Sequence, residues 1–269
     1  TRAESPVVLL SGQAPASQLG RGPFQEMSQA NIAQHVTKSS WTASDATGLA
    51  GDLARALRTA RSGRPGPVHL ALPVDLLEAR VEPEPAMPTP EELDAPDLAP
   101  DNVTAQHIVD PLAMAKRPLM LAGPAMMRGE RRDALSALGE AAQLPVVGME
   151  SPRGMNDPSL GAFAEVLPEA DLILLLGKKL DFSLGQGKSP AVGDGCRFIQ
   201  VDADPTTLEQ TRRTLADPAR LTLDCHADPA SMARQIAGLA GSGKWSTSSW
   251  RDEVAAAVAY RPADWGTLS

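Results

Sequence analysis

The chain has 269 residues, of which 42% are hydrophobic and 22% are charged, a balance typical of globular proteins with a buried core. Its formal net charge of -8 argues against a nucleic-acid partner, because phosphate recognition needs clustered Lys and Arg side chains. No stretch reaches the roughly 20 apolar residues of a membrane span and no signal peptide is present, so we expect a soluble, cytoplasmic protein without a membrane partner.

The first 80 residues predict part of an α/β domain. The chain starts at Thr1, not at Met, and opens almost directly into an apolar run, so we expect an internal piece of a longer protein. The run at 6–12 has the length and β-branched content of a buried parallel strand, and a loop follows it. Residues 46–61 carry leucines at helical spacing, with Thr47 or Asp45 available as a cap. A second buried strand, VHLALP, completes one crossover of a parallel sheet.

Residues 81–101, VEPEPAMPTPEELDAPDLAPD, predict a linker. Proline recurs there among acidic and small residues, and neither a helical nor a strand period is present. Because proline-rich chain favours extended conformations, we expect this segment to run over the surface between two domains.

Residues 102–240 repeat strands and helices in alternation. Such alternation predicts a doubly wound parallel α/β sheet with helices on both faces, a Rossmann-like central domain. Helices are predicted at 104–115, 129–142, 205–214 and 228–239, and strands at 118–123, 144–149, 170–177, 197–204 and 221–228.

The segment 241–269 predicts a second linker followed by a helix. Residues 241–249 are small and polar, and residues 250–260 have the composition of a helix that would belong to whatever follows. The chain is thus divided into part of a domain at 1–80, a linker at 81–101, a central domain at 102–240, and a connection at 241–269.

Three segments together resemble the thiamine-diphosphate-dependent enzymes that include acetolactate synthase, benzaldehyde lyase and oxalyl-CoA decarboxylase. The first is SPVVLLSGQAPASQLGRGPFQEMSQ, a strand and glycine loop that deliver Phe24, Gln25 and Glu26. The second, RSGRPGPVHLALPVDLLEA, is similar to the last strand of that family's pyrimidine-binding domain. The third, ADLILLLG followed at a distance by FIQVDADP, is similar to the family's central domain.

The resemblance implies an enzyme that makes or breaks a carbon–carbon bond next to a carbonyl, with thiamine diphosphate and Mg²⁺. It implies an acetolactate-synthase-like reaction of a small 2-keto acid, or alternatively a lyase or decarboxylase of 2-hydroxyacyl-CoA or oxalyl-CoA. Family members pair the two halves of the cofactor site between subunits, so a homodimer or homotetramer is implied. The family's catalytic glutamate would precede this chain, and its diphosphate-binding domain would follow it. We therefore expect the chain alone to be inactive.

Site residues are also implied by the resemblance. Gln25 corresponds to a loop glutamine that projects toward the reacting carbon, and its neutral amide can bond a substrate oxygen without titrating. Phe24 and Lys38 correspond to positions that line the substrate channel. The GDG at 193–195 runs directly into a predicted strand, so we interpret it as a turn and not as the metal motif.

The central domain carries candidates for a nucleotide site. Gly123 and Gly177 each follow a buried strand, where glycine permits close approach of a backbone or a ligand. Asp202 ends the strand FIQVD, where an acid can hold a ribose hydroxyl. These residues suggest FAD, as in acetolactate synthase, or ADP, as in oxalyl-CoA decarboxylase. With the domain empty, Asp202 would instead cap the helix beginning near Pro205.

Two interpretations of another class compete with this one, and the cysteine count argues against the first. A sirtuin-type NAD-binding module needs a zinc ribbon with four cysteines, and the chain has only Cys196 and Cys225. A non-catalytic nucleotide-binding or structural module is the stronger rival, since the central domain of the resembled family carries no catalytic residues.

Overall fold

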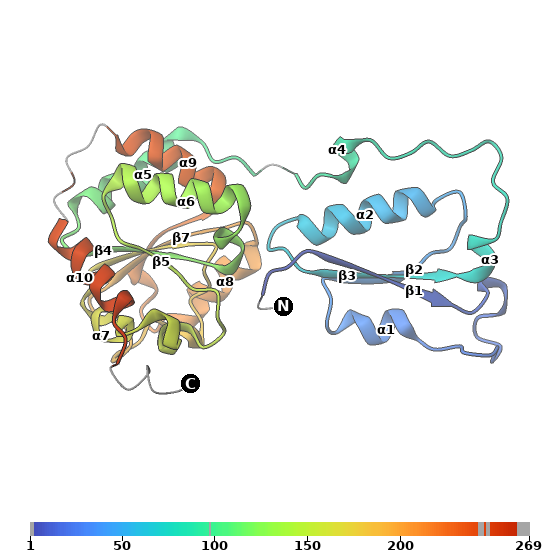
Figure 1. Ribbon diagram of the computed structural model, residues 1–269, viewed down its shortest axis with the longest axis horizontal. Coiled ribbons are helices and arrows are strands. Elements are labelled where there is room, and N and C mark those ends of the chain that lie inside the picture. The colour runs from blue at the N-terminus through green and yellow to red at the C-terminus, as the bar shows by residue number, and fades with distance from the viewer. Residues whose placement is uncertain (1–2, 97, 242–244, 246–247, 263–269) are drawn as a thin grey trace. The chain divides into compact units, whose positions relative to one another are not determined.

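The computed structural model describes residues 3–96, 98–241, 245 and 248–262. The chain divides into two compact units, Ala3–Pro96 and Asp97–Ser269, and the division falls inside the predicted linker. Each unit contains its own parallel sheet with flanking helices (Figure 1). No helix within the described ranges is long and apolar enough to cross a membrane.

The smaller unit has a three-stranded parallel sheet in the order β1-β3-β2. Helices α1 and α2 lie on opposite faces of this sheet (Figure 1). The elements are β1 (Val7–Gln13), the 3-10 turn η1 (Ala16–Gln18), α1 (Gln29–Gln34), β2 (Ser39–Thr42), α2 (Leu49–Arg61), β3 (Pro67–Pro73), α3 (Val74–Leu77) and α4 (Pro90–Leu93).

Small residues let α2 pack closely on the middle strand. Ala56 and Ala60 on one face of the helix meet Val68 of β3, and these three form the buried apolar cluster of the unit. At the helix edge, Trp41 of β2 donates its indole N–H to Asp52 at 2.9 Å. The guanidinium of Arg55 lies 4.5 Å above the same indole ring, so a polar and a cation–π contact fix β2 against α2.

The smaller unit differs from the sequence prediction in three ways. The loop predicted after β1 contains α1 and β2, so the sheet gains a strand. The cap predicted for α2 is wrong, because Gly48 occupies that position and Asp45 bonds Thr47 instead. The expected burial of β1 is also wrong: β1 is an edge strand, and Leu9 is 54% exposed.

The larger unit has a five-stranded parallel sheet in the order β5-β4-β6-β7-β8. The predicted doubly wound α/β fold is confirmed, with all five strands inside their predicted ranges. The strands are β4 (Pro118–Ala122), β5 (Val146–Gly148), β6 (Leu172–Leu176), β7 (Arg197–Asp202) and β8 (Leu221–His226).

Helices cover both faces of this sheet. Helices α5 (Asn102–Met114), α6 (Gly129–Ala142) and α9 (Pro229–Ala240) pack on one face over a large apolar cluster. Helices α7 (Phe163–Val166) and α10 (Ser248–Ala259) cover the other face (Figure 1). Helix α8 (Pro205–Thr214) connects β7 to β8. The central strand β6, LILLL, is buried along its whole length because both faces are covered.

The two segments predicted as connections, 81–101 and 241–269, both contain a helix. Linker 81–101 contains α4, which a capping box between Thr89 and Glu92 begins. Residues 242–244 and 246–247 of the second predicted linker lie outside the described residues, as do 263–269. The helix predicted in this segment is α10, and Trp250 packs it on the larger unit, with its indole N–H donating to the Pro118 carbonyl at 2.8 Å. That the helix leads to a further domain stays a prediction.

Candidate functional site

The loop between β1 and α1 carries Gln25, and its base is closed by a side chain at the end of β1. Gln13 donates from Nε2 to the Met27 carbonyl at 2.9 Å, while its Oε1 accepts the Ala14 N–H. These bonds join the two ends of the loop at the carboxyl edge of the sheet. Ligands of parallel α/β sheets bind at that edge.

A carboxylate in α3, just after the neighbouring strand β3, fixes the first part of this loop. Asp75, directly after β3, accepts the N–H of Ala16 at 2.8 Å and the N–H and hydroxyl of Ser17 at 3.2 Å. The Ala16 N–H is the main cause that lowers the pKa of Asp75 below its usual range. The loop is therefore anchored to two neighbouring strands before it reaches its tip.

Phe24 and Gln25 stand at the exposed tip. Phe24 is 88% exposed, and Gln25 has a left-handed backbone with φ of 62°. A left-handed conformation is uncommon for a residue with a side chain and marks a position worth a functional hypothesis. The structure thus places these two predicted residues together, with their side chains accessible.

Lys38, the third residue predicted for the substrate channel, has its ammonium on the end of a helix. Its Nζ donates to the carbonyls of Thr59 at 2.7 Å and Ser62 at the carboxyl end of α2. A cation at this position satisfies terminal carbonyls and complements the helix dipole. A role in substrate binding stays a prediction for Lys38, whereas the contacts of its side chain join the start of β2 to α2.

A chain of polar side chains crosses the small sheet, and the sequence analysis did not identify it. His69 of β3 is buried and contacts Ser11 through Nε2 and Ser40 through Nδ1, both at 2.8 Å. Ser11 donates to Oε1 of Gln29, whose Nε2 donates to the Gly12 carbonyl. Because the hydroxyl proton of Ser11 is donated to Gln29, Ser11 Oγ accepts the proton of His69 Nε2. The neutral imidazole therefore carries its proton on Nε2. Burial also lowers the pKa of His69.

In the larger unit, the strand order reverses between β4 and β6, and parallel sheets bind ligands at such a switch point. Gly123 follows β4 and Gly177 follows β6, so the structure brings these two predicted residues together. A Cβ built on Gly123 would lie 2.0 Å from the Gly177 carbonyl oxygen. The glycine therefore permits the two backbones to touch. Gly177 has φ of +60° and is packed against Pro229 and Met126.

Asp202 ends β7 as predicted but is fully buried. Its Oδ1 accepts the Asp204 N–H at 3.0 Å. The alternative role predicted for Asp202, capping α8, is wrong because Asp204 is the cap and accepts the Thr206 N–H at 2.9 Å. Asp202 shapes the turn before the helix, and the next carboxylate along the chain caps it.

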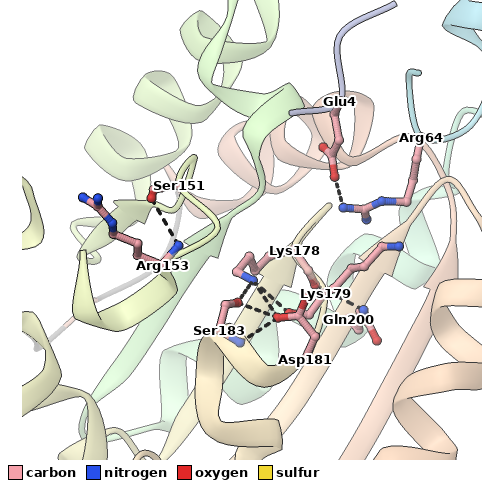
Figure 2. Close-up of polar contacts among 9 residues, drawn as sticks. All are labelled: Glu4, Arg64, Ser151, Arg153, Lys178, Lys179, Asp181, Ser183 and Gln200. Carbon is pink, nitrogen blue, oxygen red and sulfur yellow. Dashed lines mark hydrogen bonds and ion pairs between the residues drawn. The ribbon is translucent and has the colours of Figure 1, made fainter. Parts of the chain in front are cut away.

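Lys178, in the loop after β6, is buried among polar groups, and no motif in the sequence pointed to it. Lys178 donates to Ser183 Oγ and to the Lys179 carbonyl, and lies 3.6 Å from Asp181 (Figure 2). Gln200 of β7 donates to the Lys178 carbonyl at 3.2 Å, while its buried Oε1 has no hydrogen-bond partner among the described residues. The polar groups of Lys178 are thus directed inward to hold the loop after β6.

A groove of about 640 Å³ lies between α6, β5 and α10, with Leu135, Val147 and Val254 among its walls, and contains none of the predicted site residues. Within the described ranges, no group of three or more His, Cys, Asp or Glu side chains could hold a metal ion. The GDG at 193–195 forms the turn before β7, with the Cys196 N–H donating to the Gly193 carbonyl at 3.0 Å.

The chain is similar to a known protein family and to several known enzymes. The model of the family described as thiamine pyrophosphate enzyme, central domain, matches residues 105–225. Oxalyl-CoA decarboxylase of Escherichia coli K12 is 31% identical over 216 residues, and acetolactate synthase isozyme 1 large subunit of the same organism is 31% identical over 225. Each alignment covers 77% of this chain, and the chain spans about 38% of the length of these relatives.

Solved structures show the same fold. Benzoylformate decarboxylase of Polynucleobacter necessarius superposes with a TM-score of 0.67 and 19% sequence identity, covering 88% of this chain and 45% of that one. The likeness covers more of the chain than the matched residues 105–225 of the larger unit.

Proposed function

We propose that this chain, which belongs to the thiamine pyrophosphate enzyme family, is part of an enzyme that makes or breaks a carbon–carbon bond next to a carbonyl group. In this proposal residues 1–80 form the carboxyl-terminal part of the pyrimidine-binding domain and 102–240 the central domain. The observation that carries the proposal is the exposed, anchored loop that presents Gln25, in a chain whose residues 105–225 match the family model. When bound, thiamine diphosphate, the same compound as thiamine pyrophosphate, supplies the carbanion chemistry of such reactions.

The chain's own contribution in this proposal is to orient the substrate. The Gln25 amide offers a donor and an acceptor to a substrate oxygen and keeps both at every pH. Phe24 supplies an apolar wall that excludes water from the reacting carbon. Lys38 would attract a substrate carboxylate toward the loop only with a change of its contacts, because its ammonium bonds two carbonyls of the α2 end.

The described residues do not fit a magnesium and diphosphate site, since they hold no cluster of acidic or histidine ligands. No catalytic step of this chain is therefore assigned through the metal. It follows that the 269-residue chain should bind thiamine diphosphate with at best about millimolar affinity and should turn over no substrate. Measurable pyruvate decarboxylation by the purified chain would contradict the expectation that the chain alone is inactive.

Two substrate classes are open within the proposal. A 2-keto acid is supported by the similarity to acetolactate synthases, and an acyl-CoA by the similarity to oxalyl-CoA decarboxylase and to 2-hydroxyacyl-CoA lyase 1 of Dictyostelium discoideum. The test is to assay the enzyme that contains this chain, with thiamine diphosphate and Mg²⁺, against pyruvate, oxalyl-CoA and a 2-hydroxyacyl-CoA. Turnover of none of the three would refute the proposal.

A homodimer or homotetramer in the cytoplasm is also proposed for that enzyme, on the family relationship alone. Light scattering of the complete enzyme tests the assembly. A monomer that is fully active would remove this part of the proposal without touching the rest.

A second candidate function is nucleotide binding, with FAD or ADP at the carboxyl edge of the larger sheet. Its support is the position of Gly123 and Gly177 at the switch point, with Asp202 at the end of the neighbouring strand. Asp202 would have to leave its bond to Asp204 to reach a ribose hydroxyl, since it is buried. Calorimetric titration of the wild type and of Asp202→Ala with FAD and ADP is the test. The candidate requires wild-type binding that weakens about tenfold or more in the variant.

A further inference from the structure

One carboxylate holds the tip of the loop between β1 and α1. Glu26 accepts the Gly20 N–H through Oε1 and the Gly22 N–H through Oε2, the second at 2.9 Å. The Glu26 N–H in turn donates to the Pro23 carbonyl at 3.1 Å. Both carboxylate oxygens are used, and together with the backbone bond they close the segment 20–26 on itself.

The backbone of this segment is shaped around the carboxylate. Gly20 and Gly22 have φ of +81° and +75°, in the left-handed region that only glycine adopts without strain. Left-handed turns of this kind direct backbone N–H groups toward a common point, where they bind an anion. Nothing lies within 4 Å of a Cβ at either glycine, so the conformation and not a lack of space requires glycine there.

The same bonds determine where Gln25 lies. The turn from Pro23 to Glu26 places Phe24 and Gln25 at its two central positions, and Gln25 has a left-handed backbone. Such a backbone is unfavourable for glutamine by itself, so contacts elsewhere in the segment must hold it. The Glu26 side chain provides those contacts from the residue directly after Gln25.

We propose that Glu26 is the positioning residue of this loop: it binds the two glycine N–H groups and thereby presents Gln25 in the orientation that its proposed contact with substrate requires. The inference rests on the proposed function for the role of Gln25. An amide cannot replace the carboxylate, because a glutamine side chain has one acceptor oxygen and would direct its NH₂ donors at the second N–H.

The first experiment measures the loop directly in the 269-residue chain. Hydrogen exchange of the Gly20 and Gly22 amides, followed by NMR, should be slow in the wild type and about tenfold faster in Glu26→Gln, because charge-assisted bonds are lost. Glu78→Gln, which removes an exposed charge from the same unit, is the matched control and should leave both amides unchanged. Equal exchange in wild type and Glu26→Gln would overturn the proposal.

The second experiment uses the complete thiamine-dependent enzyme. Gln25→Ala and Glu26→Gln should each lower kcat by about tenfold to a hundredfold with little change in KM or Tm, since both remove a correctly oriented amide. The double variant should be no slower than the slower single variant, because both act through one group. Loss in Gln25→Ala without loss in Glu26→Gln, or additive losses, would overturn the positioning role alone. No loss in Gln25→Ala would instead refute the proposed function of Gln25.

Discussion

The two units of the chain are stabilised in different ways. The larger unit has apolar clusters on both faces of its sheet, and strand β6 is buried from end to end. The cluster of the smaller unit consists of Ala56, Ala60 and Val68, and its strand β1 leaves Leu9 half-exposed. Polar side chains at loop ends and helix ends connect the elements of the smaller unit. A loop can therefore be positioned by hydrogen bonds where apolar burial is small.

Truncation of a leucine in each unit should give the largest contrast. Leu174 is fully buried in the middle of β6. Leu174→Ala should lower the free energy of unfolding by about 3 kcal/mol, because apolar burial is lost and a cavity is left. Leu9→Ala in β1 should cost less than about 1 kcal/mol, because that side chain is already half in water. Urea unfolding monitored separately for each unit by hydrogen exchange measures both. Equal losses would show that the two units do not differ as described.

An arginine in the larger unit offers the next largest effect and tests whether polar contacts matter there too. The Arg220 guanidinium donates to the carbonyls of Cys196, Gly187 and Gly193 at 2.7 to 2.8 Å, which joins residue 220 to the segment ending at Gly187 and to the turn at 193–196. Arg220→Met should cost about 2 kcal/mol in urea unfolding, since the half-buried carbonyls lose a charged donor. Arg213→Met is the control: its ion pair with Glu209 is exposed and should contribute less than about 0.5 kcal/mol.

Strands of the larger unit could be predicted because each signal is local. An apolar run such as 172–176 marks a buried strand wherever helices cover both faces, and Pro205 after an acid marks the start of α8. The prediction that Asp202 caps α8 was wrong because the geometry of the turn, which residue types alone do not reveal, places Asp204 at the cap.

The smaller unit was harder to predict for a physical reason. Residues 39–42, SSWT, contain one large apolar side chain, and α1 contains only Ile32, so neither segment has a clear period. The Gln25 loop was found through family resemblance. The hydrogen bonds of Gln13, Asp75 and Glu26 that hold this loop could not be predicted, because the fold alone determines the partners of these residues.

The stability of the smaller unit should depend on pH through His69. Burial lowers the pKa of His69 from 6.5, so below pH 6.5 the unfolded chain binds a proton that the folded unit resists. Stability should therefore be full above that pH and fall as the pH decreases toward the lowered pKa, by at most about 1.4 kcal/mol per pH unit. Following the Trp41 indole N–H signal during urea unfolding reports on this unit alone. His69→Gln should abolish the slope, and exposed His35→Gln should retain it.

The smallest expected effect on stability comes from Asp157 in the larger unit. The pKa of Asp157 is lowered to about 2, first by the Ser151 hydroxyl and then by the hydroxyl and N–H of Ser159. NMR titration should find its midpoint near 2, and Ser151→Ala should move it upward toward 3.8. The lowered pKa stabilises the folded state above about pH 3.8, and this contribution is lost between pH 3.8 and 2. A midpoint unchanged by Ser151→Ala would contradict this cause.

In the proposed enzyme, the loop of the smaller unit acts on the substrate and the larger unit does not contact the reacting carbon. Gln25 and Gln186 allow a matched test, because both have exposed side chains and left-handed backbones, with φ of 62° and 57°, in different units. In the complete enzyme with thiamine diphosphate and Mg²⁺, we predict that Gln25→Ala lowers kcat at least about tenfold and that Gln186→Ala equals the wild type. Equal turnover by the two variants, or a loss confined to Gln186→Ala, would contradict the claim.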